Sequence, residues 1–250
     1  MSFFLSSLFI CFIPLAIPRL AWYNCLMAKL EYTFKTDTLF KMLFGKNPDL
    51  LENLVCDLLE IPIASISQFD ITNPEMPAEA MGEKFCRLDI HMIVDGQHIT
   101  LEIQVRNEGD FPERILHQWA RVYSNAIERG GDYKKLPRTV IISIIDFSLF
   151  DCAEFHSEFR TIEVTRHEEL TDKLTLHFFE LKKAPKDISD KNMLKLWLAL
   201  FKADTQEELD KIKALASNYA PREAVWMKNI FKTWRTINAN KTKKCAKALA

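Results

Sequence analysis

The chain has 250 residues, of which 48% are hydrophobic and 27% are charged, as in an ordinary globular protein with a sizeable core. Its formal net charge of −1 excludes a nucleic-acid binder that is basic over its whole surface, so any basic surface must be local. The 6 cysteines include no CxxC pair and the 6 histidines no HExxH motif, which argues against a zinc site or a disulfide framework and for a reducing cytoplasm.

The chain begins with an apolar stretch, SFFLSSLFICFIPLAI over residues 2–17. It lacks the basic residues that usually precede the apolar core of a signal peptide. Pro14 and Pro18 cut it short of the roughly 20 apolar residues of a membrane helix. We therefore expect translation to start at Met27, the extension over 1–27 to have little order, and the protein to be cytoplasmic without stable membrane association. A membrane-anchored form is the alternative.

Two short helices and a strand are expected next. The first helix covers Thr36–Phe44, with Thr36 or Asp37 as its N-cap and Gly45 as its stop. The second runs from Pro48 to Leu59 and carries leucines at helical spacing, which predicts a core-facing side. Residues 66–72 read as a strand.

The next segment, FCRLDIHMIVDGQHITLEIQVR over 85–106, predicts two strands joined by a tight turn at Asp95-Gly96. Counting outwards from that turn places Asp89 directly opposite Glu102. Alternate positions then form one apolar face and one polar face. Facing carboxylates repel each other, and a divalent cation between them would remove that cost. The alternative is an amphipathic hairpin with a solvated face.

A helix is expected from about Asp110 to about Glu128. Its polar stripe consists of Arg114, Gln118, Arg121 and Asn125. This stripe is either an ordinary solvated face or a surface that turns arginine towards a phosphate or a metal site, to which its planar fork is suited. An interior strand over Thr139–Phe147 follows. Beyond it we predict a loop or short helix over Cys152–Arg160 and strands over Ile162–Thr165 and Leu174–Leu181.

From residue 189 the pattern becomes helical. Helices are predicted over Asn192–Lys202, Thr205–Ala216 and Pro221–Asn238. The last of these carries Lys228, Lys232 and Arg235 and leads into a basic tail. These cations could follow a phosphate backbone, and an ordinary solvated terminal helix explains them equally well.

The pattern of an aspartate on one strand and Glu-x-Gln on the next resembles the PD-(D/E)XK nuclease superfamily. The closer resemblance is to its Rpn family of recombination-promoting nucleases, the transposase branch. It rests on TDTLFKMLFG over 36–45, on the hairpin, and on ERILHQWARVYSNAIERGGDYKKLPRTVIISIIDFSLF over 113–150. The resemblance implies an α/β fold, with a restriction-endonuclease-like core of a small mixed β-sheet flanked by helices. We therefore expect a nuclease-like domain over 28–188 and a helical C-terminal extension over 189–250.

The same resemblance assigns candidate site residues. The catalytic set would be Asp89, Glu102 and Gln104, and Asp89, Glu102 and the backbone carbonyl of Ile103 would hold Mg²⁺ or Mn²⁺. Supporting candidates are Asp37, Arg87, Arg106 and Arg114, and candidate nucleic-acid contacts are Arg121, Lys228, Lys232 and Arg235. Gln104 stands where the superfamily usually has lysine. A glutamine can orient a water but supplies no charge, so we expect modest activity.

The leading hypothesis is a metal-dependent DNA endonuclease associated with recombination or mobile elements. One alternative is a catalytically weak or inactive nuclease fold that binds DNA or a protein partner. Another is a metal-dependent phosphodiesterase that acts on RNA or a small nucleotide. The sequence leaves the oligomeric state open.

Overall fold

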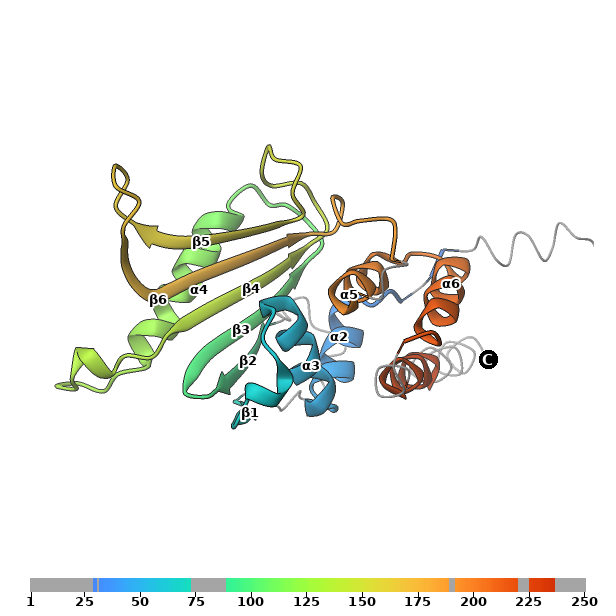
Figure 1. The fold of residues 1–250 in the computed structure, drawn as a ribbon, viewed down its shortest axis with the longest axis horizontal. Coiled ribbons are helices and arrows are strands. Elements are labelled where there is room, and N and C mark those ends of the chain that lie inside the picture. The colour runs from blue at the N-terminus through green and yellow to red at the C-terminus, as the bar shows by residue number, and fades with distance from the viewer. Residues whose placement is uncertain (1–28, 31, 73–88, 189–191, 220–224, 237–250) are drawn as a thin grey trace, which may run out of the picture.

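The computed structural model of the chain describes residues 29–30, 32–72, 89–188, 192–219 and 225–236 (Figure 1). The apolar extension, the segment over 73–88 and the basic tail beyond 236 lie outside these residues. The expectations about the order of the extension, and the candidate Arg87, therefore lie outside the described part of the chain.

The hairpin forms as expected. Strand β2 (Asp89–Val94) pairs with β3 (Gln97–Gln104) in antiparallel register, and Asp89 lies opposite Glu102. Asp95 and Gly96 have φ angles of +46° and +77°, the left-handed conformation that a two-residue hairpin turn of this kind requires. Gly96 adopts such a φ without steric cost. The tight turn can therefore form here, and it fixes which residues of the two strands face each other.

Four further strands complete one mixed sheet, in the order β1-β2-β3-β4-β6-β5. They are β1 (Phe69–Ile71), β4 (Thr139–Ile145), β5 (His156–Ile162) and β6 (Glu169–Glu180). The β3–β4 and β4–β6 pairs are parallel, and the other pairs are antiparallel. Every residue of β4 is buried, as its run of β-branched residues predicted. The expected small mixed sheet is therefore confirmed.

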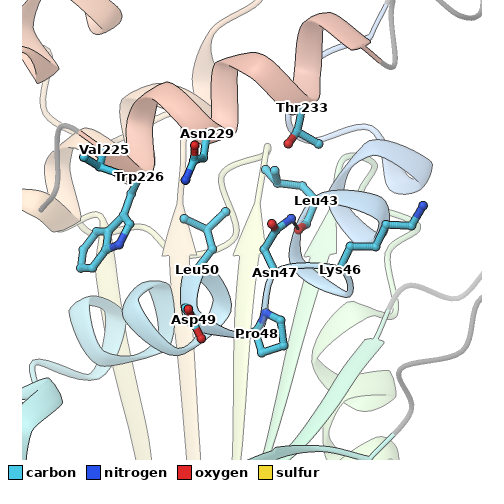
Figure 2. A pocket seen from close by; sticks show the side chains of 10 residues that line it. All are labelled: Leu43, Lys46, Asn47, Pro48, Asp49, Leu50, Val225, Trp226, Asn229 and Thr233. Carbon is cyan, nitrogen blue, oxygen red and sulfur yellow. Dashed lines mark hydrogen bonds between the residues drawn. The ribbon is translucent and has the colours of Figure 1, made fainter.

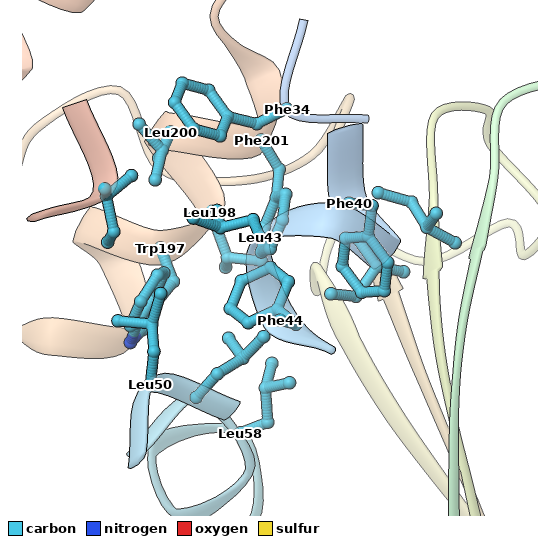
Figure 3. Close-up of a cluster of buried hydrophobic side chains, with 14 of the residues drawn as sticks. Phe34, Phe40, Leu43, Phe44, Leu50, Leu58, Trp197, Leu198, Leu200 and Phe201 are labelled. Carbon is cyan, nitrogen blue, oxygen red and sulfur yellow. The ribbon is translucent and has the colours of Figure 1, made fainter. Parts of the chain in front are cut away.

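Helices lie on both faces of the sheet (Figure 1). One core cluster joins β2, β3 and β4 to α2 (Asp37–Phe44), α3 (Pro48–Leu59), α5 (Met193–Lys202), α6 (Gln206–Ala216) and a helix over 225–236. Phe40, Phe44, Trp197 and Phe201 meet at its centre (Figure 3). The helices after residue 189 thus share a core with α2.

A second, smaller core cluster lies under α4 (Phe111–Asn125) on the opposite face. Phe111 and Ile115 pack there against Ile141, Ile145 and Phe178. The sheet therefore has an apolar layer on each side, and α4 covers the face on which Glu102 lies.

Two expectations about the second half of the sheet are wrong. Residues 156–160, expected in a loop or short helix, belong to strand β5, and Glu163–Thr165, expected in a strand, lie in the connection between β5 and β6. β5 is an edge strand with mostly half-buried or exposed residues, so it lacks the apolar pattern that marks an interior strand. Its pairing with the following strand β6 decides its conformation.

Candidate active site

Glu102 lies in the third-last position of β3, and only 6% of its surface is exposed. Its Cα faces that of Asp89 on the antiparallel neighbour β2 and that of Ser143 on the parallel neighbour β4. Paired residues of adjacent strands share a face, so all three positions lie on the face that α4 covers. A buried carboxylate is costly unless it is paired, so the Glu102 side chain needs a partner.

Arg114 is the partner of Glu102. Its Nη2 donates to Oε1 of Glu102 at 3.1 Å, and its Nη1 lies 3.5 Å from Oε2 of Glu108. The guanidinium also sits over the Phe111 ring, 5.0 Å from the ring centroid. These contacts fix the arginine in the first turns of α4. The polar stripe of this helix is therefore not wholly a solvated face, because Arg114 turns inwards to the carboxylate.

The two residues after Glu102 present their backbone carbonyls on opposite sides of β3. The Gln104 carbonyl accepts from the Asp146 N–H at 2.9 Å, on the side of β4. Successive carbonyls of a strand alternate in direction, so that of Ile103 points towards β2, the strand that carries Asp89. The side-chain amide of Gln104 donates to the Arg106 carbonyl at 2.9 Å, which holds this side chain at the end of β3.

These groups fit the oxygen-donor set that Mg²⁺ or Mn²⁺ prefers: the Glu102 carboxylate, the Ile103 carbonyl and the aspartate position directly across the ladder. The side chain of Asp89 lies outside the described part of the structure. Among the side chains that are described, no three His, Cys, Asp or Glu residues come together in a way that could hold a metal ion. The fit therefore rests on register and donor chemistry.

The remaining candidates are dispersed. Asp37 is the first residue of α2, and its side chain lies outside the described part; Thr36 is the N-cap of that helix. Arg106 and Arg121 are exposed. Three further cations, Lys228, Lys232 and Arg235, are exposed on the helix over 225–236, whose buried side joins the core opposite α4. The structure thus brings Arg114 to Glu102, and it does not bring the C-terminal cations there.

Glu108 and Ser143 are polar groups beside the Glu102–Arg114 pair that the sequence did not single out, whereas Gln118 belongs to the polar stripe that it did. Glu108 holds the second arm of Arg114, and Thr100 shares a hydrogen bond of 2.8 Å with Nδ1 of His91. Ser143 and Gln118 have buried side-chain atoms without a hydrogen-bond partner among the described residues. Ser143 interrupts an otherwise apolar run, VIISII, in an interior strand, and that interruption is the one signal that could have marked it.

A buried lysine lies at the other face of the sheet's carboxyl-terminal edge. Lys35 Nζ is 2.6 Å from Oδ2 of Asp146 and 3.1 Å from Oδ1 of Asp204. Burial alone would lower the pKa of Lys35, but its hydrogen bonds with the two carboxylates and their charges raise it above the usual value. Lys35 thereby ties the segment before α2 to the end of β4 and to the α5–α6 connection.

A pocket of about 400 Å³ lies between the α2–α3 connection and the helix over 225–236 (Figure 2). Asn47, Pro48 and Trp226 are among its lining residues, whereas Glu102, Gln104 and Arg114 are not. It is therefore separate from the carboxylate site.

The family comparison agrees with the geometry of the hairpin. A family model described as PD-(D/E)XK nuclease family transposase matches residues 34–248, which confirms the resemblance seen in the sequence. No curated protein and no solved structure showed a significant match. In the described part of the chain, no helix combines the length and the apolar character that crossing a membrane needs. The chain belongs to the PD-(D/E)XK nuclease family of transposases.

Proposed function

We propose that the protein is a metal-dependent DNA endonuclease that acts in recombination or in the movement of mobile elements. One observation carries the proposal. In a chain of this nuclease family, the hairpin register sets Asp89 opposite Glu102, and Arg114 holds the buried Glu102 carboxylate at 3.1 Å. A structural hairpin has no need to bury a carboxylate opposite a second one.

Each residue has a defined part in this proposal. Asp89, Glu102 and the Ile103 carbonyl would hold Mg²⁺ or Mn²⁺. Such an ion, when bound, lowers the pKa of a water and neutralises charge that develops on a phosphodiester. Arg114 is a positioning residue, because it fixes the rotamer of Glu102 and pairs with its charge.

Gln104 is suited to orienting the attacking water through its amide. It carries no charge with which to stabilise a hydroxide or the transition state. To orient a water, the amide N–H of Gln104 would have to release the Arg106 carbonyl, or the amide oxygen of Gln104 would have to accept a hydrogen bond from the water instead. We therefore expect turnover to be modest.

Plasmid cleavage in Mg²⁺ and then Mn²⁺ tests the proposal, with protein that starts at Met27. We expect Asp89→Asn and Glu102→Gln each to lower the cleavage rate at least about 100-fold, and Arg114→Gln to lower it about 10- to 100-fold. The cleavage rate of Gln104→Ala measures how much that residue contributes to catalysis. The matched control is Gln97→Ala, at the far end of β3. Equal cleavage by the parent and the Asp89 and Glu102 variants would point to a contaminating nuclease and refute the assignment.

A nuclease fold that only binds DNA is the second candidate, because one exposed side of the helix over 225–236 carries Lys228, Lys232 and Arg235. Replacing all three by glutamine would then lower DNA affinity and reduce its dependence on salt, whereas Asp89→Asn would leave affinity unchanged. Protein that cuts no DNA with either metal but binds it in this manner would favour this function over the first.

A further inference from the structure

The outer edge of β5 has an unusual combination of charge and exposed apolar surface. β5 is the last strand of the sheet, and no other strand of the described residues pairs with its outer side. Its central residue, Phe159, is 42% exposed although it packs on Phe150 and Phe178 at ring-centroid distances of 5.1 Å and 5.6 Å. In Figure 1 this strand runs along the open side of the sheet. Uncovered edges of this kind are templates for pairing with another strand.

The direction of the backbone groups along this edge follows from the ladder on the other side. The Phe155 carbonyl accepts from the Glu180 N–H at 2.7 Å, so this residue directs its backbone groups to β6. Hydrogen-bonded positions alternate in an antiparallel ladder, and the register continues without a shift from His156 to Arg160. Phe159 therefore also directs its groups to β6, whereas the N–H and C=O groups of Glu158 and Arg160 face outwards.

The ladder becomes irregular after Arg160, but the extra residues belong to β6. Arg160 pairs with Thr175 and the next residue, Thr161, pairs with Thr171, so β5 advances one position while β6 advances four. The outer side of β5 therefore keeps a regular strand conformation, which leaves it competent to pair. This differs from an edge strand that carries a bulge of its own, a common protection against association.

We propose that β5 pairs with β5 of a second copy of this chain, antiparallel about a two-fold axis at Phe159. The sequence of the strand is complementary to itself in this register. Glu158 falls opposite Arg160 of the second copy, Arg160 falls opposite its Glu158, and Ser157 falls opposite its Thr161. Opposite charges on facing strand positions stabilise a pair, and like charges destabilise it.

The backbone directions fit the same register. The outward groups of Glu158 and Arg160 form hydrogen-bonded pairs across the axis, and the two Phe159 residues form the close pair without hydrogen bonds. Within one chain, Nε of Arg160 already lies 2.6 Å from Oε1 of Glu158. Pairing across the axis joins the two ion pairs into a ring of four alternating charges, and it extends the cluster of Phe150, Phe159 and Phe178 from one copy to the other. The two six-stranded sheets become one continuous sheet.

Substitutions that reverse the charge of Glu158 or of Arg160 test this register. Sedimentation velocity of the full chain, from about 1 to about 200 µM, should show a species of twice the 29.1 kDa mass of the chain as concentration rises. E158R alone and R160E alone each place like charges opposite one another, and both should stay monomeric. An equimolar mixture of E158R and R160E restores opposite charges at both facing positions and should dimerise. Arg166→Glu, on the β5–β6 connection, makes the same change of charge away from the axis and should dimerise like the parent.

A second readout does not depend on affinity. Residues in a close, non-hydrogen-bonded antiparallel pair have Cα atoms about 4.5 Å apart, within reach of a disulfide. In a background in which every cysteine except the buried Cys56 is replaced by serine, Phe159→Cys should therefore form an intermolecular disulfide under mild oxidation, whereas Ser157→Cys should not. A parent that is monomeric over the whole range, a mixture that fails to associate, or equal crosslinking of both cysteine variants would each overturn the proposal. None of these results bears on whether the protein cleaves DNA.

Discussion

Acidification should destabilise the protein through one buried imidazole on the α3 face of the sheet. His177, in β6, is 6% exposed, and its Nδ1 lies 3.0 Å from Nε2 of His156 on β5. Burial lowers the pKa of His177 to about 4, and the nearby charges of His156, Arg138 and Arg160 act in the same direction. The negative charge of Glu158 acts in the opposite direction and raises the pKa of His177. The contact also requires one ring nitrogen to accept, and two protonated rings would present two donors to each other.

The sign and size of the effect follow from linkage. The unfolded chain takes up a proton at this position near pH 6.5, whereas the folded chain resists it until about pH 4. Between those values the unfolded state binds more protons, so the free energy of unfolding falls as the pH falls. The stability that depends on a neutral His177 is therefore intact above about pH 6.5 and lost by about pH 4. A difference of about 2.5 between the pKa values of the unfolded and folded states corresponds to about 3 kcal/mol in the free energy of unfolding.

Urea unfolding between pH 7.5 and pH 4, followed by circular dichroism, measures this loss. We expect His177→Gln to lower stability at pH 7.5 but to flatten the dependence on pH, so that the parent and the variant converge near pH 4. His117→Gln, which alters an exposed histidine of α4, is the matched control and should keep the slope of the parent. If the parent and His177→Gln lost stability in parallel over this range, the reasoning about the buried imidazole would be refuted.

Three further substitutions test separate local interactions by urea unfolding at pH 7.5. Lys35→Met leaves the Asp146 carboxylate, whose side chain is 21% exposed, without its cation, and should cost about 3 kcal/mol; a loss below about 1 kcal/mol would contradict it. Thr205→Ala removes the capping box formed with Glu208 and should cost about 1 kcal/mol, whereas Thr205→Ser should keep most of that stability. Gly96→Ala places a side chain at φ +77° and should cost about 1–2 kcal/mol, and an unchanged midpoint would show that the hairpin turn relaxes.

The hairpin could be predicted from the sequence because a local rule determines it. Asp95-Gly96 specifies a two-residue turn, and the turn fixes every facing pair, including Asp89 with Glu102. Helix α3 has the bounds Pro48–Leu59 that its proline and leucine spacing predicted. Strand β5 could not be predicted in this way, because its residues alternate only weakly in hydropathy. Its conformation depends instead on pairing with β6, whose first residue lies 7 positions after the last residue of β5.

The contact between Arg114 and Glu102 shows a different limit. The helical spacing of Arg114, Gln118 and Arg121 predicted that they share a stripe, but a stripe does not say which member turns inwards. That depends on how α4 lies over the sheet, and Phe111 and Ile115 decide it by packing in the second core cluster. Arg121, two turns further along, remains exposed as a result. Spacing along one helix therefore identified the candidates, and packing between layers selected among them.

The packing of α4 also explains how Arg114 comes to lie beside Glu102. Residues 105–110 form the short connection from β3 to α4, so the first turns of the helix return to the end of the strand that they follow. Arg114 then meets Glu102 across only 12 positions of the chain, and its apolar neighbours in the helix are fixed in the core. A buried carboxylate is costly unless it is paired, and the guanidinium of Arg114 is the partner of Glu102. Under the function proposed above, Arg114 would hold Glu102 in place for a metal ion, and this role would account for an arginine beside a pair of carboxylates.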